Sequence, residues 1–392
     1  MKIIYITGGL TPYRIAFCDK LNDYLMKEKK GELKLFLLSE ESFNSNYNNK
    51  DLMRAYAKFI PGRTITLKDQ TTRFMINPSI IRHIKQERPD FIILGGSWTH
   101  PSTWILLANK KQIKVPIYFW AESHLHNGLK RKQKKWWKEI LKRRVYNYFD
   151  GFFVPGLYAR EAISETKCKN QSNYYILPNL IEEEKYMQAN ARRKKRDELR
   201  KKYNVTDSQC VLFTPSRLVD LKGIIEFLDN GESVLQNENI VWIIAGIGPL
   251  EEEIRKKAEN KGIKVQLVGF IEQDKIIDYL AMVDFFVLPS LSDPNPLSVI
   301  EALWAGLPIV LSKYVGNVPE TLVEQSNGFV FDTLSKEDVE RVLLLCLLSD
   351  SEWKQKAGQI SREKAEAGFN MNREIKKLVN KIEEIIYDNS KK

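Results

Sequence analysis

Two cations that could bind a diphosphate follow an apolar run in the second half of the sequence. Arg217 and Lys222 lie five residues apart in the stretch 215–223, which ends in a glycine. Arginine offers a planar fork of N–H donors and lysine a point charge, so together they could hold one diphosphate from both sides. Two solvated surface cations are the alternative.

A glycine-containing turn comes next along the chain. Gly246 and Gly248 lie between the apolar run Trp242–Ala245 and the charged, helix-like stretch Glu251–Asn260. Glycines allow backbone N–H groups to approach a ligand at a helix N-terminus, which makes Gly248 a candidate for ligand binding. The third glycine of a dinucleotide fingerprint is missing, so the turn does not predict an NAD site. A tight turn without a ligand is the alternative.

Two acidic residues bracket the start of an expected helix further along. Asp293 and Glu301 follow the apolar run Phe285–Leu288, and the helix start between them contains Asn295, Pro296, Leu297 and Ser298. Free N–H groups at a helix start favour a phosphate, and ionised carboxylates accept hydrogen bonds from the hydroxyls of a sugar or a ribose. In the alternative interpretation, Asp293 caps the helix and Glu301 is a surface charge.

The elements that would position these residues are short β-branched or aromatic runs, separated by longer amphipathic stretches. This alternation predicts an α/β protein with two doubly wound, Rossmann-like domains that face a central cleft. The strands expected in the first half are Lys2–Ile6, Leu33–Leu38, Phe91–Leu94, Ile117–Trp120, Gly151–Val154 and Tyr174–Leu177. Those expected in the second half are Cys210–Thr214, Trp242–Ala245, Lys264–Val268, Phe285–Leu288, Ile309–Leu311 and Gly328–Phe331.

The domain boundary is expected where the apolar content falls. The stretch from Ile181 to Tyr203 contains the basic run Arg192–Arg196, and it predicts a linker that leads into a basic helix. We therefore expect a first domain at 1–185, a linker at 186–205 and a second domain at 206–365. The remaining 366–392 contains an amphipathic helix, Asn372–Tyr387, which we expect to return toward the first domain.

The composition excludes several classes of protein. The 392 residues are 43% hydrophobic and 28% charged, which is typical of a folded globular chain. The four cysteines are scattered without CxxC spacing, so neither a zinc site nor a disulfide framework is indicated. No apolar run approaches the ~20 residues of a membrane-spanning helix, and the start resembles a strand more than a secretory signal. A cytoplasmic location is expected.

A basic stretch with adjacent tryptophans indicates a surface partner. Over 130–144 there are nine cations and one acid, and Trp136 and Trp137 would share a helical face with Ile140 and Leu141. That composition favours a helix lying on an anionic membrane surface. Packing of Val145 and Tyr148 against the sheet is the alternative for this face. Nucleic acid is not expected as a partner, because it gives no reason for the tryptophans.

Taken together, the motifs of the second half resemble the donor domain of retaining family 4 glycosyltransferases of the GT-B fold. The resemblance spans Val211–Phe331 and runs in order through four motifs. These are Arg217 with Lys222, the turn Gly246–Leu250, the strand-end loop Val268–Phe270, and the E-x7-E block with its AGxP ending at Asp293–Pro308. This sequence departs from the family at the first acid, where Asp293 replaces the usual glutamate.

The resemblance implies roles for residues in both halves. Arg217 and Lys222 would bind the donor diphosphate, Phe270 with Ile271 would contact the base, and Glu301 would bind the ribose. Asp293 would contact the donor sugar if its shorter side chain reaches it. In the first half, the loop at Gly8 and Gly9 is similar to the glycine-rich acceptor-side loop. His124 would face the donor sugar, with Glu122 and His126 as rivals for that position.

The function expected from this resemblance is metal-independent transfer of a sugar, with retention, from a nucleotide-diphosphate sugar to a glycan. The acceptor is expected to be lipid-linked and the product a cell-surface polysaccharide. No cofactor is expected, and no Asp-x-Asp motif occurs in the chain. A GT-B enzyme with soluble acceptors, such as one similar to glycogen synthase, is one alternative. An inactive basic protein that binds membrane surfaces is another.

Overall fold

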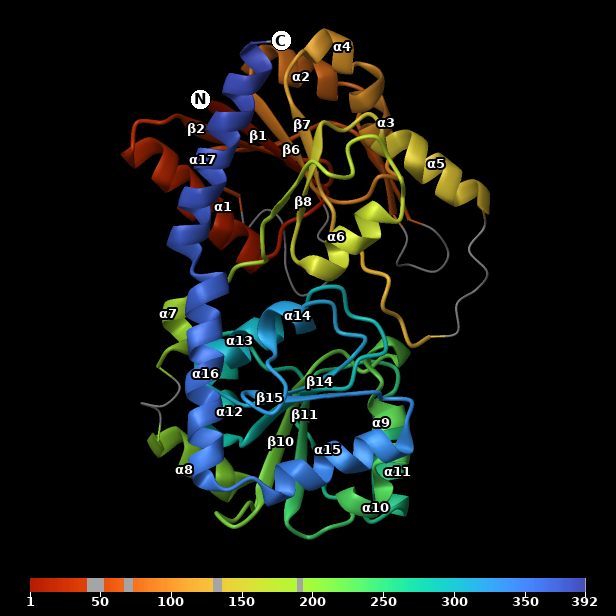
Figure 1. Cartoon of the computed structure of the whole chain (residues 1–392), viewed down its shortest axis with the longest axis vertical. Helices are drawn as coiled ribbons and strands as arrows, with labels where there is room; N and C mark the ends of the chain where they lie inside the picture. The colour runs from red at the N-terminus through yellow and green to blue at the C-terminus, as the bar shows by residue number, and fades with distance from the viewer. Residues whose placement is uncertain (41–52, 67–72, 130–135, 189–192, 392) are drawn as a thin grey trace.

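Two parallel β-sheets, each flanked by helices, form the two lobes of the computed structural model (Figure 1). The structure describes residues 1–40, 53–66, 73–129, 136–188 and 193–391. The first sheet has the strand order β3-β2-β1-β6-β7-β8-β9. Its strands are β1 (Lys2–Thr7), β2 (Glu32–Leu37), β3 (Ala57–Phe59), β6 (Phe91–Leu94), β7 (Ile117–Trp120), β8 (Gly151–Val154) and β9 (Tyr174–Ile176).

The helices of the first lobe cover both faces of this sheet, as right-handed crossovers between parallel strands require. They are α1 (Pro12–Lys27), α2 (Ile80–Glu87), α3 (Pro101–Ala108), α4 (Lys110–Ile113), α5 (Trp136–Tyr146) and α6 (Leu157–Ser164). An antiparallel pair, β4 (Arg63–Thr66) and β5 (Arg73–Ile76), lies apart from the sheet. The sequence analysis missed β3, β4 and β5, whose side chains are mostly half-buried or exposed.

The second sheet has the order β12-β11-β10-β13-β14-β15, and all its neighbouring strands are parallel. Its strands are β10 (Cys210–Pro215), β11 (Ile240–Ala245), β12 (Val265–Leu267), β13 (Phe285–Leu288), β14 (Ile309–Ser312) and β15 (Gly328–Phe331). Its helices are α8 (Arg193–Lys202), α9 (Ile224–Asn230), α10 (Glu232–Leu235), α11 (Glu251–Asn260), α12 (Ile276–Met282), α13 (Leu297–Ala305), α14 (Val318–Thr321) and α15 (Lys336–Leu348).

The last two helices connect the lobes (Figure 1). Helix α16 (Ser351–Phe369) packs on α13, and α17 (Met371–Ser390) packs on α1 of the first lobe. Lys30 Nζ and Glu383 Oε2 form an ion pair at 2.8 Å. The expected return of the C-terminal helix to the first lobe is therefore observed, although α16 continues through the expected boundary at 366.

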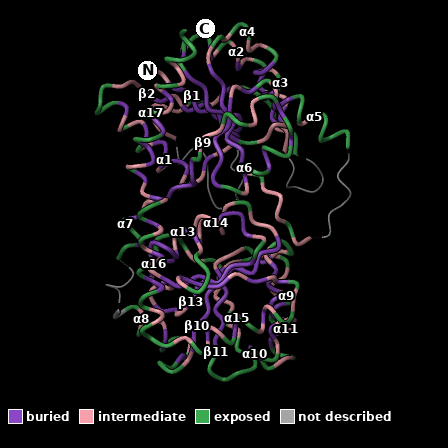
Figure 2. Tube along the Cα trace, in the orientation of Figure 1, coloured by how far each residue is buried: buried purple, intermediate pink, exposed green. Residues whose placement is uncertain are grey.

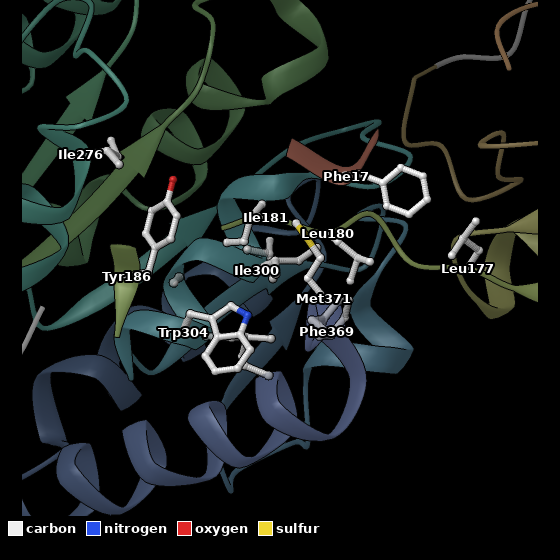
Figure 3. Close-up of a cluster of buried hydrophobic side chains, with 14 of the residues drawn as sticks. Phe17, Leu177, Leu180, Ile181, Tyr186, Ile276, Ile300, Trp304, Phe369 and Met371 are labelled. Atoms are coloured by element: carbon white, nitrogen blue, oxygen red, sulfur yellow. The ribbon is translucent and has the colours of Figure 1, made fainter. Parts of the chain in front are cut away.

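Part of the low-apolar stretch that contains the expected linker is buried. Ile181 and Tyr186 are each 1% exposed, and Tyr186 ends the short helix α7 (Glu183–Tyr186), which contacts α13 of the second lobe. Figure 3 shows both side chains in an apolar cluster with Trp304 and Met371. Burial elsewhere is concentrated at the two sheets (Figure 2). The lobes therefore share a packed junction on one side of the cleft.

Candidate active site

Lys222 of the first motif is paired with Asp293, the first acid of the third motif. Lys222 Nζ forms a close ion pair with Asp293 Oδ2, and both side chains are mostly buried. Gly223 permits this geometry because its φ is +63° and a Cβ there would lie 2.2 Å from the Pro289 carbonyl oxygen. Helix α13 is capped at Pro296, so the alternative in which Asp293 is the cap is wrong.

Arg217 lies in the same loop with an exposed side chain, and among the described residues no ion pair holds it. The glycine turn after β11 supports this loop. A Cβ at Gly246 would lie 1.9 Å from the Ser216 carbonyl oxygen, and one at Gly248 would lie 2.2 Å from that of Leu218. Both glycines therefore allow a close approach of two backbone segments, and a role of Gly248 in ligand binding stays a prediction.

The second acid of the third motif lines a pocket between the lobes. Glu301 shares this pocket, of about 290 Å³, with Ile271 and Leu297 from the second lobe and with the loop Thr11–Tyr13 from the first. Tyr186 Oη donates a hydrogen bond to Glu301 Oε1 at 2.8 Å. Burial raises the pKa of Glu301, and the bond from Tyr186 opposes that shift. The hydrogen bond from Tyr186 thus helps to fix the orientation of the carboxylate.

The remaining residues expected on the donor side do not all meet in this pocket. Phe270 is 51% exposed and is absent from the pocket lining, whereas the adjacent Ile271 is part of it. The Asn295 Nδ2 atom is buried without a hydrogen-bond partner. Pro296 is buried, and its carbonyl accepts a bond from Asn317 Nδ2 at 3.1 Å. Ser298 is half-buried in the first turn of α13.

The glycine loop of the first lobe reaches the same pocket. Gly8 and Gly9 follow β1, and the chain then turns through Thr11 into α1, whose first residue is Pro12. The Thr11 hydroxyl is buried and has no partner in the structure. The loop therefore presents both an unpaired hydroxyl and a helix N-terminus, where N–H groups are free.

The three candidates after β7 have separate environments. Glu122 pairs with Arg14 at 3.0 Å, and His126 stacks on Tyr158 and lies 3.3 Å from Glu161. His124 is different, because both of its ring nitrogens are buried without a partner. Burial lowers the pKa of His124 to about 4, and the nearby carboxylate of Asp293 opposes the shift. Of the three, His124 is therefore the side chain that approaches the second lobe with free hydrogen-bonding atoms.

The structure describes only part of the basic stretch with the tryptophans. Residues 130–135 lie outside the described part of the chain, and α5 begins at Trp136. Trp136 is 74% exposed and Trp137 47%, whereas Val145 is buried against the sheet. No described helix has the length and apolar character needed to span a membrane. The described residues also contain no cluster of acidic, histidine or cysteine side chains that could hold a metal ion.

Comparison with known proteins agrees with this geometry in the second lobe. Residues 195–364 match the family described as glycosyl transferases group 1. These residues form a glycosyl transferases group 1 domain. The match covers the Arg217 loop, Glu301 and the whole second sheet.

Curated relatives in the group include an alpha-monoglucosyldiacylglycerol synthase of Streptococcus pneumoniae. It is 28% identical over 185 residues, which are 46% of this chain and 42% of the relative. The sulfoquinovosyl transferase SQD2 of Arabidopsis thaliana is 24% identical over 298 residues, 74% of this chain and 56% of the relative. The aligned part of the chain thus spans about half the length of the curated relatives it matches.

Solved structures extend the likeness in fold to the whole chain. Anabaena Alr3699/HepE, in complex with UDP and glucose, has a TM-score of 0.72 at 15% identity and covers 98% of this chain and 99% of its own. Sucrose-phosphate synthase from Thermosynechococcus elongatus also has a TM-score of 0.72 at 15% identity, covering 99% and 100%. The expected GT-B fold is confirmed.

Two residues that the sequence analysis did not select support the site of this group 1 domain and its partner lobe. Tyr186 orients Glu301, and its only sequence signal is an aromatic residue in a stretch of low apolar content. Arg14 is buried over the Trp120 ring at 4.0 Å and pairs with Glu122. A lone arginine in the first turn of a helix gives no such indication, because its partners lie more than 100 residues away.

Proposed function

We propose that this chain is a retaining glycosyltransferase that moves a sugar from a nucleotide-diphosphate sugar to a glycan acceptor. The pocket between the carboxyl edges of the two sheets is the observation that carries the proposal. It is lined by Glu301 and the Thr11–Tyr13 loop. Ligands of doubly wound domains bind at this edge. Because the Anabaena structure contains UDP and glucose, a UDP-sugar is the first donor to test.

In this proposal, Arg217 and Lys222 bind the diphosphate and Glu301 binds the ribose. The bond between the anomeric carbon and the diphosphate oxygen breaks, and a bond to the acceptor oxygen forms on the same face of the sugar. The acceptor proton passes to the departing phosphate oxygen. Positive side chains stabilise the charge that grows on this leaving group, which is the task of a preorganised electrostatic site.

The experiment is an assay of donor hydrolysis and transfer with a panel of UDP-, GDP- and ADP-sugars. We expect one donor to be consumed, and transfer to show an α-linked product from an α-linked donor by NMR. A chain that binds no nucleotide sugar would contradict the proposal. Inversion of the anomeric configuration would contradict retention alone. The variant Lys256→Ala is a suitable control, because this exposed lysine lies on α11 and its ion pair is with Glu252.

We further propose a lipid-linked acceptor in cell-surface glycan synthesis, with the enzyme on the cytoplasmic face of the membrane. The relatives that support this include proteins named for a glycolipid and for biosynthesis of amylovoran. The exposed tryptophans of α5, beside its cations, would bind the anionic surface. Electrostatic binding should weaken in salt, whereas the contribution of the indole rings should remain.

Vesicle co-sedimentation tests this docking. We expect the protein to pellet with anionic vesicles more than with neutral ones, and Trp136→Ala with Trp137→Ala to remove the salt-resistant part. Leu348→Ala is the matched control, because Leu348 is 80% exposed on α15 of the other lobe. Equal pelleting with both kinds of vesicle would mean that α5 is not a membrane contact and that the acceptor is soluble.

A further inference from the structure

An apolar groove lies between α3 and α5 on the first lobe, where Figure 1 shows the two helices as neighbours. Trp104 and Leu107 of α3 form one wall, and Leu141 and Val145 of α5 form the other. Its volume is about 820 Å³, compared with about 290 Å³ for the pocket at Glu301. This size is within the range of about 300–1,000 Å³ that is typical of small-molecule sites.

The groove exposes apolar surface that the fold itself does not need. Trp104 of α3 is 44% exposed, and Tyr148, in the turn after α5, is 56% exposed. Trp104 Nε1 already donates a hydrogen bond to the Trp98 carbonyl at 2.8 Å. An apolar occupant could therefore cover this ring without leaving its N–H unpaired. Contiguous exposed apolar surface of this kind marks a binding site.

Cations lie at one end of the groove. Lys110, Lys111 and Arg144 are part of its lining, and no carboxylate is among the lining residues. Lys110 is committed to Asp150, at 2.7 Å. In the described part of the chain, neither Lys111 nor Arg144 takes part in an ion pair. The groove thus combines an apolar channel with unpaired positive charge at its mouth. These features match a ligand that has an apolar acyl chain and an anionic head group.

The position of the groove distinguishes its occupant from the substrate of the cleft. Lys110 and Lys111 precede β7, and Tyr148 precedes β8, so this end of the groove is at the amino edge of the sheet. The pocket at Glu301 lies at the carboxyl edge. The exposed Trp136 at the start of α5 extends the same helix toward solvent. A lipid of the bilayer, not the glycosyl acceptor, is therefore the matching ligand.

We propose that this groove binds one acyl chain of an anionic phospholipid, whose phosphate lies against Lys111 and Arg144. The proposal rests on the membrane docking proposed above and adds a specific lipid site to it. A bound chain would anchor the lobe more firmly than surface charge alone, because each buried methylene adds to the affinity while the cations select the head group.

Native mass spectrometry with phosphatidylglycerol in mixed micelles tests the site. We expect a 1:1 adduct with the wild type and less adduct with phosphatidylcholine. Ala108→Trp should fill the groove from its exposed rim and weaken the adduct about tenfold, as the loss of about two buried methylenes would. Ala367→Trp, at an exposed position on α16, is the matched control and should leave the adduct unchanged.

A second variant separates the head group from the chain. Arg144→Glu should remove the preference for phosphatidylglycerol over phosphatidylcholine without preventing a neutral adduct. Circular dichroism would establish that all variants fold. An adduct of equal strength in wild type and Ala108→Trp, or no preference between the two lipids, would overturn the proposal.

The outcome is distinguishable from that of the proposed function. Ala108→Trp should keep wild-type hydrolysis of the nucleotide sugar, because this position lies outside the cleft. It should also keep the salt-sensitive pelleting with anionic vesicles that α5 provides. A wild type that holds the lipid but consumes no donor would refute the glycosyltransferase and leave the lipid site standing. A wild type that is active but holds no lipid would refute the lipid site and leave the glycosyltransferase standing.

Discussion

Several candidate groups of the cleft are already paired on the second lobe, whereas others on the first lobe are not. On the face of the second lobe, Lys222 pairs with Asp293, and Tyr186 donates to Glu301. On the face of the first lobe, the Thr11 hydroxyl and both nitrogens of His124 are buried without partners. Buried polar atoms without partners are costly, so the first face is incomplete without a ligand. On the second face the two acids are preorganised, although Asn295 Nδ2 is buried there without a partner. This face is the one that the family comparison covers.

The largest effect should come from the charges of the preorganised face. We expect Arg217→Ala and Lys222→Ala each to lower kcat/KM by about 10²–10³, because each removes a cation that stabilises the leaving diphosphate. Steady-state kinetics with the donor found in the panel would measure this. Removal of Lys222 also leaves Asp293 unpaired, so the double variant Lys222→Ala with Asp293→Asn is needed to separate chemistry from folding.

That double variant should fold as well as the wild type and remain as inactive as Lys222→Ala. Near-wild-type kinetics in both single variants would contradict the assignment of the diphosphate to this face. The comparison of the two faces would then give no information about where the donor binds. Lys256→Ala again serves as the control for loss of a surface cation.

A smaller effect should come from the ribose side of the same face. Glu301→Gln should weaken binding of the free nucleoside diphosphate about tenfold, because hydrogen bonds to a charged acceptor contribute about 1.5–3 kcal/mol. Tyr186→Phe should weaken it less, since this residue only positions the carboxylate. Isothermal titration calorimetry gives both affinities. Tyr203→Phe is the control, because its hydroxyl bonds to Tyr279 at 2.8 Å outside the pocket.

An unchanged affinity in Glu301→Gln would contradict the assignment of Glu301 to the ribose. If Tyr186→Phe equalled Glu301→Gln, the tyrosine itself would contact the nucleotide, and the description of it as a positioning residue would be wrong.

The unpaired face should be recognisable by its pH dependence. The folded-state pKa of His124 is lowered to about 4, below the usual 6.5, because burial disfavours the imidazolium. Between these two values the unfolded chain binds a proton that the folded chain does not. Stability should therefore fall as the pH falls from about 6.5 to about 4. Urea unfolding of wild type and His124→Asn at several pH values measures this.

We expect the variant to lose part of the slope that the wild type shows in this window. Equal slopes in the two proteins would mean that His124 is solvated in solution, and the first face would then not be the incomplete one. Addition of the nucleotide sugar should reduce the difference if the ligand supplies the missing partner.

The sequence analysis located the fold better where strands are buried on both faces. The bounds of β6, β7, β8, β13 and β15 coincide with the expected ones. All but β15 are inner strands of their sheets, and inner parallel strands form short, continuous apolar runs between turn residues. The missed strands β3, β4 and β5 lie at an edge or in a separate pair, where three or four residues of mixed exposure carry no such pattern.

Candidate site residues could be selected from the sequence only where a single segment carries them. Arg217, Lys222 and Glu301 were selected from local motifs, and their roles stay predictions. The pairing of Lys222 with Asp293 joins residues 71 apart, and that of Tyr186 with Glu301 joins residues 115 apart. Which acid serves which partner depends on how the strands are ordered in the sheet, and spacing along the chain does not give that order. The close contact of Gly246 and Gly248 with the loop at Ser216 and Leu218 is equally invisible in the sequence.

The smallest expected effect concerns metal ions. It tests whether the side chains of the second lobe can stabilise the leaving diphosphate without a bound cation. A diphosphate leaving group needs positive charge, and Arg217, Lys222 and the N-terminus of α13 would supply it. The close pair of Lys222 with Asp293 reduces this supply until the donor arrives, so a divalent cation is the obvious substitute. We expect EDTA to leave kcat/KM unchanged in the wild type. Activity that falls in EDTA and returns with Mg²⁺ or Mn²⁺ would show that Lys222, paired with Asp293, does not neutralise the diphosphate. The second lobe would then need a bound cation, just as the first lobe needs a partner for its unpaired groups.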